Sequence, residues 1–190
     1  VAGLFSLTGV WMQTLVLGWV SYELTGSAFL LAVFTTARLS PMFLGPIGGV
    51  LADRLNRIRF MMIIFFVMAI VSVGLALLSS FGRLEYWHIV VGGFLLGIGG
   101  APLQPARVSM ITDVVDRKDL TNAMAMNSVA FDITRVLGPA VGGVLLDFLG
   151  VANSLWISVI WYIVAIASLV PIFNLKGSTV RTTGSPFRDV

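Results

Sequence analysis

The amino-acid sequence predicts an all-α membrane protein, a bundle of six transmembrane helices. Of its 190 residues 57% are hydrophobic, only 11% are charged, and the mean hydropathy is +0.97, whereas soluble domains carry about a quarter charged residues. The apolar residues gather in runs near twenty long, the length that crosses about 30 Å of hydrocarbon. Between two such runs, the stretch Gly45 to Arg59 carries three arginines in one short connection, which marks the cytoplasmic side of a membrane.

Six apolar runs set the expected organisation of the chain. They cover approximately residues 4–20, 28–51, 60–80, 87–111, 120–146 and 155–173. Polar turns separate them, among them Tyr22 to Gly26 and Gly150 to Asn153. We expect residues 1–175 to form one bundle, and residues 176–190, rich in Ser, Thr and Gly, to be a polar cytoplasmic linker or a disordered tail. Because the chain begins inside an apolar run, we expect it to be a fragment.

Lys and Arg divide unequally between the two sides of the predicted membrane. One side has only Arg83. The other side has eight of these residues: Arg54, Arg57, Arg59, Arg117, Lys118, Lys176, Arg181 and Arg188. The positive-inside rule places the second group in the cytoplasm, and an even number of spans then puts both termini there.

A similar sequence occurs in the second span and in the fifth. Gly45 to Asp53 reads GPIGGVLAD, and Gly138 to Asp147 reads GPAVGGVLLD. The two spans run in opposite directions, so the matching ends face opposite sides, which is typical of the three-plus-three inverted repeat of secondary transporters. Convergence is the alternative, because Gly and Pro are frequent in membrane helices.

Three ionisable residues lie inside predicted spans. Arg38 falls near the middle of the second, and Asp132 and Arg135 near the middle of the fifth. A charge at the centre of a membrane helix costs roughly 2.5–3.5 kcal/mol on insertion scales, so these side chains are not expected to face lipid. Asp132 and Arg135 share a helix face and can pair. A structural ion pair is one interpretation, and a substrate or proton path, with Gln13 as a further lining residue, is the one we favour.

Glycines and a proline mark two helices as sites of bending or close packing. Gly138, Pro139, Gly142 and Gly143 lie in the fifth span. Proline removes a backbone donor and kinks a helix, and glycine permits a tight crossing, so this segment is predicted to let its helix bend or rock. The spacing Gly93-x3-Gly97 in the fourth span predicts another helix crossing.

The sequence argues against an enzyme. It has no Walker-type phosphate loop, no HExxH motif and no set of histidines for a metal, and its lone His88 lies at the wrong depth to act with Asp132. We therefore expect no catalytic residue, no cofactor and no metal. The pI near 9.8 reflects three net charges that topology explains, so we expect no nucleic-acid partner. The expected partners are the lipid bilayer and a small-molecule substrate.

Three motifs resemble those of the major facilitator superfamily. GVLADRLNRIR, from Gly49 to Arg59, resembles the loop signature G-x-L-A-D-R-x-G-R-K/R-x, placed after the second helix as that family requires. Gly138 to Gly143 resembles the antiporter signature of the family's fifth helix, which ends in GPxxGG. A further set resembles the exporter branch that contains enterobactin and macrolide efflux proteins: Pro105 to Arg107, Asp113, Asp119 to Ala123, and Arg135 to Pro139. The resemblance covers all six spans and implies the N-terminal half of a twelve-helix carrier.

The resemblance implies a cytoplasmic gate at residues 49–59, beginning with Gly49. Asp53 would face the C-terminal half and latch the outward-open state. Arg54 or Arg57 would pair with an acid near the fourth helix, for which Asp113 is the candidate.

The resemblance also implies that helices one, two, four and five line a central cavity. The residues it places near cargo are Gln13, Arg38, Asp132 and Arg135. Two positions depart from the family pattern: Asn56 stands where the loop signature has Gly, and Gly93 where the proton-linked signature of the fourth helix would have Arg. The familiar coupling arginine is therefore missing.

The predicted function is that of an efflux carrier for a small organic molecule, such as a drug, a macrolide or a siderophore-like compound, working by alternating access in a bacterial inner membrane. A proton gradient acting through Asp132 is the expected energy source. The expected partner in the same protein is a C-terminal six-helix half that is missing from this chain. The alternatives are a non-transporting scaffold or receptor built on a carrier fold, and a half-size carrier that acts as a dimer.

Overall fold

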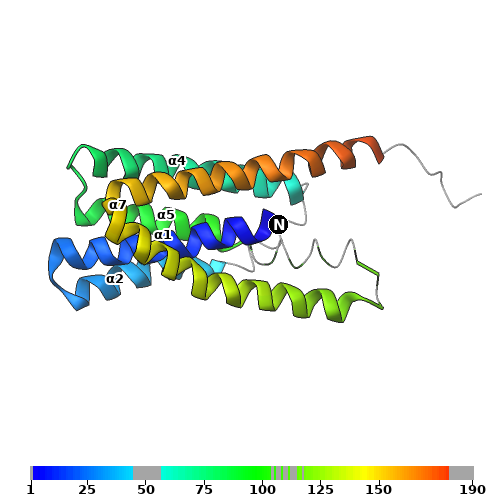
Figure 1. Cartoon of the computed structure of the whole chain (residues 1–190), viewed down its shortest axis with the longest axis horizontal. Helices are drawn as coiled ribbons and strands as arrows, with labels where there is room; N and C mark the ends of the chain where they lie inside the picture. The colour runs from blue at the N-terminus through cyan, green and yellow to red at the C-terminus, as the bar shows by residue number, and fades with distance from the viewer. Residues whose placement is uncertain are drawn as a thin grey trace, which may run out of the picture.

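The computed structural model describes residues 2–44, 57–103 and 118–179, together with positions 105, 108, 111, 115 and 116. The described residues form helices and contain no β-strand, so the predicted all-α fold class is confirmed. Figure 1 shows these helices packed side by side, with their long axes close to one common direction.

The helical elements follow one another in this order along the chain. They are α1 (Ala2–Thr25), α2 (Ala28–Leu39), the 3-10 helix η1 (Ser40–Leu44), α4 (Arg57–Ser80), α5 (Tyr86–Gly100) and α7 (Leu120–Thr179). The last of these comprises two helices, because Gly150, with φ 74° and ψ 177°, is not helical. Figure 1 shows the chain doubling back there, so we call residues 120–149 the first leg of α7 and residues 151–179 the second leg. With η1 counted as part of α2, the described residues form six helical rods.

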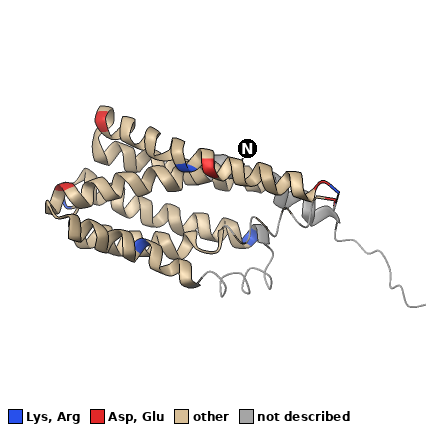
Figure 2. Cartoon of the chain, turned by 90° about the horizontal axis from the view of Figure 1, so that it is seen from below, with Lys and Arg blue, Asp and Glu red and all other residues tan. Residues whose placement is uncertain are grey.

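Length and apolar composition suit several of these rods to a membrane. Arg59–Ser80 and Leu120–Val170 are long and apolar enough to cross one, and the 51 residues of the latter suffice for two crossings. Ala28–Phe43 and Tyr86–Gly100 are apolar but shorter. Large apolar side chains also remain exposed on the outside of the bundle, including Phe29, Phe43, Phe66, Val136 and Phe148. Such extensive apolar surface favours contact with lipid over water, and Figure 2, in which charged residues are coloured on the ribbon, shows few of them along the rods.

Three turns at one end of the bundle each contain a glycine in the left-handed region. Gly26, Gly82 and Gly150 have φ of 61°, 66° and 74°, a conformation that costs glycine little because it lacks a Cβ. Figure 1 shows these turns together at the end away from the N-terminus. Each therefore joins an outgoing rod to a returning one, α1 to α2, α4 to α5, and the first leg of α7 to the second.

The core lies where α1 meets α4, α5 and the second leg of α7. The side chains buried there are almost all apolar and include Val16, Leu17, Phe34, Phe65, Met68, Ile89, Leu96, Leu155 and Tyr162. Glycines bring α5 close to its neighbours on two sides. A Cβ on Gly93 would lie 2.7 Å from the ring of Phe34 in α2, and one on Gly99 would lie 2.8 Å from Met68 in α4. The predicted small-residue crossing of the fourth span is thus present, and it involves two neighbouring helices.

Some boundaries differ from those predicted. The turn expected from Tyr22 begins only at Gly26, because α1 stays helical to Thr25. In the second span the α-helix ends at Leu39 and continues as η1, since Pro41 has no N–H for an α-helical bond. At the other end of the chain, helix extends to Thr179, so the first residues of the predicted polar tail are helical.

Most of the predicted cytoplasmic gate lies outside the described residues. Gly49, Asp53, Arg54 and Asp113 are not described, and Arg57 is described only as the first residue of α4. The first copy of the repeated sequence, Gly45 to Asp53, is likewise outside the described part, so the inverted repeat stays a prediction.

Candidate functional site

Asp132 and Arg135 lie halfway along the first leg of α7, and both are exposed. They follow Leu120 by twelve and fifteen residues, which at about 1.5 Å per residue places them roughly 18–22 Å along the helix. At that depth a side chain is far from either end of its rod. An ionised group facing hydrocarbon there would cost roughly 2.5–3.5 kcal/mol on insertion scales.

Arg135 contacts an aromatic ring of α1 instead of its neighbouring acid. Its guanidinium carbon lies 5.5 Å from the centroid of the Trp11 ring, within the range of a cation–π interaction. Phe131, one turn earlier, meets the same indole edge to face at 6.0 Å. Asp132 and Arg135 are both described, and no ion pair joins them. The predicted pairing is therefore not present in this structure, because the longer arginine side chain extends across to α1.

Arg38 is buried where α2 faces α1. Only 7% of its surface is exposed. Its Nη2 donates to the carbonyl of Val10 at 3.3 Å, and its Nη1 is buried without a hydrogen-bond partner. The Tyr162 hydroxyl lies within electrostatic range of its guanidinium, and in the described part of the chain no acid forms an ion pair with it. The position of Arg38 inside a span was predicted from the sequence. Its hydrogen bond to a backbone carbonyl was not predicted.

Gln13 connects three helices through hydrogen bonds. Its Nε2 donates to Ser72 Oγ in α4 at 2.7 Å, and its Oε1 accepts from the Tyr162 hydroxyl in the second leg of α7 at 2.7 Å. All three side chains are fully buried. Gln13 thus lies in the helix core in this structure, although we predicted that it would line a substrate path. The sequence analysis missed Ser72 and Tyr162, whose signal was polarity inside apolar runs, where such groups need partners.

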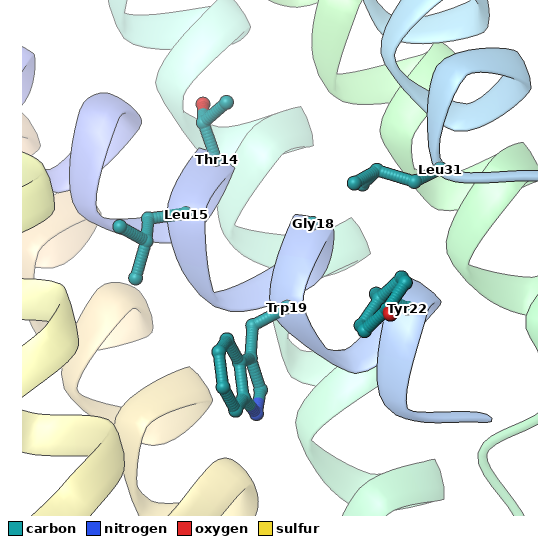
Figure 3. Close-up of a pocket in the computed structure, with 6 residues that line it drawn as sticks. All are labelled: Thr14, Leu15, Gly18, Trp19, Tyr22 and Leu31. Atoms are coloured by element: carbon teal, nitrogen blue, oxygen red, sulfur yellow. The ribbon is translucent and has the colours of Figure 1, made fainter. Parts of the chain in front are cut away.

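An open apolar groove of about 420 Å³ lies between α1 and α2. Its lining consists of Thr14, Leu15, Gly18, Trp19, Tyr22 and Leu31. Figure 3 shows Trp19 and Tyr22 extending from α1 and Leu31 facing them from α2. The hydroxyl of Thr14 donates to the Val10 carbonyl at 2.7 Å, so it is satisfied within its own helix. The groove therefore presents almost no free polar group besides the tyrosine hydroxyl and the indole N–H.

The glycines predicted to bend the fifth span form a tight contact with α1. A Cβ on Gly138 would lie 2.5 Å from Trp11 Cβ, and one on Gly142 would lie 3.0 Å from the Met12 carbonyl oxygen. A Cβ on Gly143 would meet nothing within 4 Å. Along α7 the only non-helical residue in the described backbone is Gly150, so the helix continues through Pro139. Their visible role is close packing, the alternative that accompanied bending in the prediction.

Apolar rods with ionised side chains halfway along one of them define a polytopic membrane protein with the architecture of a transporter. The chain belongs to the transmembrane secretion effector family of the major facilitator superfamily, whose model matches residues 1–177. The predicted resemblance to that superfamily is thereby confirmed. Members of this superfamily are integral membrane proteins with several spans, so the predicted multi-pass class follows.

Relatives and a solved structure agree with this assignment. The staphyloferrin A transporter of Staphylococcus aureus is 26% identical over 86% of this chain and 42% of its own length. The multidrug efflux pump Tap of Mycolicibacterium fortuitum is 25% identical over 90% of this chain, again 42% of its own length. The chain thus spans about two fifths of these relatives. The crystal structure of an auto-inhibited peptide transporter of the POT family shares the fold with a TM-score of 0.64 at 17% identity, covering 99% of this chain and 39% of that one.

Proposed function

We propose that this chain is the N-terminal half of a secondary efflux carrier for a small organic molecule, working by alternating access in a bacterial inner membrane. The observation that carries the proposal is the exposure of Asp132 and Arg135 halfway along the first leg of α7. Ionised groups at this depth face a water-filled cavity or a polar partner. In a carrier the partner is the C-terminal half, and the cavity between the halves holds the cargo.

The wall of that cavity would be the face that α1 and the first leg of α7 share. Trp11 from α1 and Arg135 from α7 already meet there, and Asp132 lies one turn away with its carboxylate unpaired among the described residues. We propose Asp132 as the group that exchanges a proton during transport. The cytoplasmic gate would lie at residues 49–59, at the end of the bundle away from the three glycine turns, with the termini of the chain on the same side.

Two packing features would divide the half into fixed and moving parts. The hydrogen bonds of Gln13 tie α1 to α4 and to the second leg of α7, which favours a rigid block. Gly138 and Gly142 bring the first leg of α7 close to the backbone of α1. The side-chain contacts of Trp11 with Arg135 and Phe131 cross the same interface, so a movement of this leg on α1 would have to release them.

Reconstituted protein tests the proposal directly. The protein expressed from its complete reading frame is placed in liposomes, and cargo exchange is measured under an imposed pH gradient. Asp132→Asn is expected to abolish pH-driven exchange while equilibrium binding of cargo persists, because the amide cannot release a proton. Asp147→Asn is the matched control, an exposed carboxylate on the same leg but near its end. Unaltered pH-driven exchange in Asp132→Asn would remove Asp132 from the coupling path.

The same assay separates the competing functions. A receptor or scaffold built on this fold would bind ligand without moving it under any gradient. A half-size carrier would exchange cargo as a dimer of a chain that has no further spans.

A further inference from the structure

We propose that the groove between α1 and α2 binds the apolar ring system of an amphipathic organic anion, whose charged head lies beside Arg135. This inference rests on the proposed carrier function and specifies the class of its cargo. Its starting point is a row of residues on one side of α1, which leads from Trp11, the contact of Arg135, to the residues that line the aromatic groove.

One face of α1 carries both features. Trp11, Leu15, Gly18 and Tyr22 are spaced by four, three and four residues, which places them on a single side of an α-helix. Trp11 is the residue that contacts Arg135, and the other three line the groove. The opposite side of the helix is enclosed, with Met12, Gln13, Val16, Leu17 and Val20 at most 4% exposed. The groove and the charges thus lie on the same side of α1, where the first leg of α7 packs against Trp11 and leaves the groove open further along the helix.

Asp132 and Arg135 indicate whether this side of α1 faces lipid or a water-filled cavity. Arg135 and Asp132 are exposed beside Trp11, at the start of this row of residues on α1. Ionised groups at that depth do not face lipid. Because the groove continues along the same side of the same helix, we infer that it too faces the cavity between the two halves. Trp19 and Tyr22, exposed by 57% and 48%, are then available to a cargo.

The groove is an open depression whose volume and apolar lining are compatible with the ring system of a small molecule. Its volume of about 420 Å³ falls within the range of roughly 300–1,000 Å³ typical of small-molecule pockets. Two aromatic rings and two leucines form most of the lining, so it suits an aromatic or otherwise apolar ring system. At about 1.5 Å per residue, Gly18 and Tyr22 lie roughly 10 to 16 Å along α1 from Trp11. A cargo of that length reaches both the groove and Arg135.

The sign of the head group follows from the charge balance in the middle of the rods, away from Glu23 and Asp147 near their ends. Arg38 and Arg135 are two cations against the single carboxylate of Asp132. Arg38 also keeps a buried Nη1 without a hydrogen-bond partner, which leaves a positive field behind this wall. An anionic head is therefore favoured over a cationic one of equal size.

Binding of matched probes to the protein from its complete reading frame, held in lipid nanodiscs, tests the inference by calorimetry. Pyrenesulfonate is expected to bind more tightly than benzenesulfonate, because only its ring system reaches the groove, and more tightly than the cation pyrenemethylammonium. Trp19→Ala should weaken pyrenesulfonate about tenfold and leave benzenesulfonate unchanged. Phe29→Ala is the control, an aromatic residue of α2 that is 74% exposed and does not line the groove.

A second variant fills the groove without removing an aromatic side chain. A Cβ on Gly18 would lie 3.7 Å from Leu31 Cδ1 and 3.8 Å from Phe34 Cε1, ordinary contact distances, so the Cβ of Gly18→Phe fits without a shift of α1, and its ring is intended to occupy the groove. It should abolish the preference for pyrenesulfonate over benzenesulfonate, and size-exclusion chromatography checks that it is folded.

Several outcomes would overturn the inference. They are equal loss in Trp19→Ala and Phe29→Ala, tighter binding of the pyrene cation, or equal binding of neutral pyrenemethanol, which would identify the groove as a lipid site. Flux separates this inference from the proposed function. Probe binding with the expected dependence but no transport of any cargo would retain the groove and reject the carrier. If the protein transports cargo but its affinity for the probes depends neither on ring size nor on Trp19, the proposed groove site would be rejected and the carrier function kept.

Discussion

Two adjacent glycines of α7 offer a sharp test of whether the GPxxGG segment acts by packing or by bending. Gly142 is buried against α1, where a Cβ would lie 3.0 Å from the Met12 carbonyl oxygen and 3.3 Å from its Cα. Gly143, the next residue, would place a Cβ in open space. Substitution by alanine changes helix propensity equally at both positions. Any difference between the two variants therefore measures the contact with α1.

The structure predicts an order of stability for three glycine-to-alanine variants of α7. Gly143→Ala should stabilise the protein by up to about 1 kcal/mol, the propensity gain of alanine over glycine in a helix. Gly142→Ala has the same gain, but its Cβ requires α1 to move by a few tenths of an ångström, which offsets it. Gly138→Ala should be the worst, because its Cβ would lie 2.5 Å from Trp11 Cβ. Overpacking of this kind costs about 1–3 kcal/mol, so after a propensity gain of about 1 kcal/mol its net loss should be about 0–2 kcal/mol.

Equilibrium unfolding of the purified protein in mixed micelles, titrated with sodium dodecyl sulfate, gives the three free energies of unfolding relative to wild type. Packing predicts the order Gly143→Ala, Gly142→Ala, Gly138→Ala from most to least stable. If the segment acts through backbone flexibility, alanine at 143 should harm the protein as much as alanine at 142. Equal losses at these two positions would refute the packing argument.

Three further results are expected. Gln13→Leu should lower the free energy of unfolding by about 1–3 kcal/mol, since it removes two interhelical hydrogen bonds worth about 0.6–1.7 kcal/mol each. Tyr162→Phe should cost about half as much, and a double-mutant cycle analysed by the same unfolding assay would show no coupling if the 2.7 Å bond is absent. Gly97→Ala should destabilise strongly, because its Cβ would overlap the Arg38 carbonyl oxygen, whereas Gly100→Ala, with nothing within 4 Å, should not; equal unfolding midpoints would contradict the α2–α5 crossing. Arg57→Cys should react with a membrane-impermeant maleimide only after cells are opened, and labelling of intact cells would reverse the predicted orientation.

The fold class was predictable because the membrane imposes it. Composition and the lengths of the apolar runs sufficed to predict helical rods, since hydrocarbon admits few other backbone structures. Boundaries were less accessible. The end of α2 at Leu39 depends on Pro41, which an apolar run conceals, and α1 continues through polar residues to Thr25 because a helix does not stop where hydrophobicity falls.

The candidate site was predictable in its members and less so in their contacts. Ionisable residues within apolar runs stand out in any sequence, so Arg38, Asp132 and Arg135 could be named as candidates, and their role in transport stays a prediction. Which partner each chooses depends on the rotation of neighbouring helices, and that is fixed by many apolar contacts at once. Thus Arg135 meets Trp11 instead of Asp132, and Gln13 points into the core instead of the cavity.

The two sides of α1 differ in how firmly they are held, and this difference connects the observations above to the proposed transport. One side is fixed by the Gln13 hydrogen bonds and by fully buried apolar residues, so in the proposed carrier it would resist change when the halves move. The other side carries Trp11 and the groove, with exposed aromatic rings and an arginine held only by a cation–π contact worth about 0.5–2 kcal/mol. An anionic head competes for that arginine more strongly than an indole does, because a charge-assisted hydrogen bond replaces a weaker attraction. Arrival of cargo would thereby loosen the contact between α1 and the first leg of α7 at the point where the glycines bring the two helices close together.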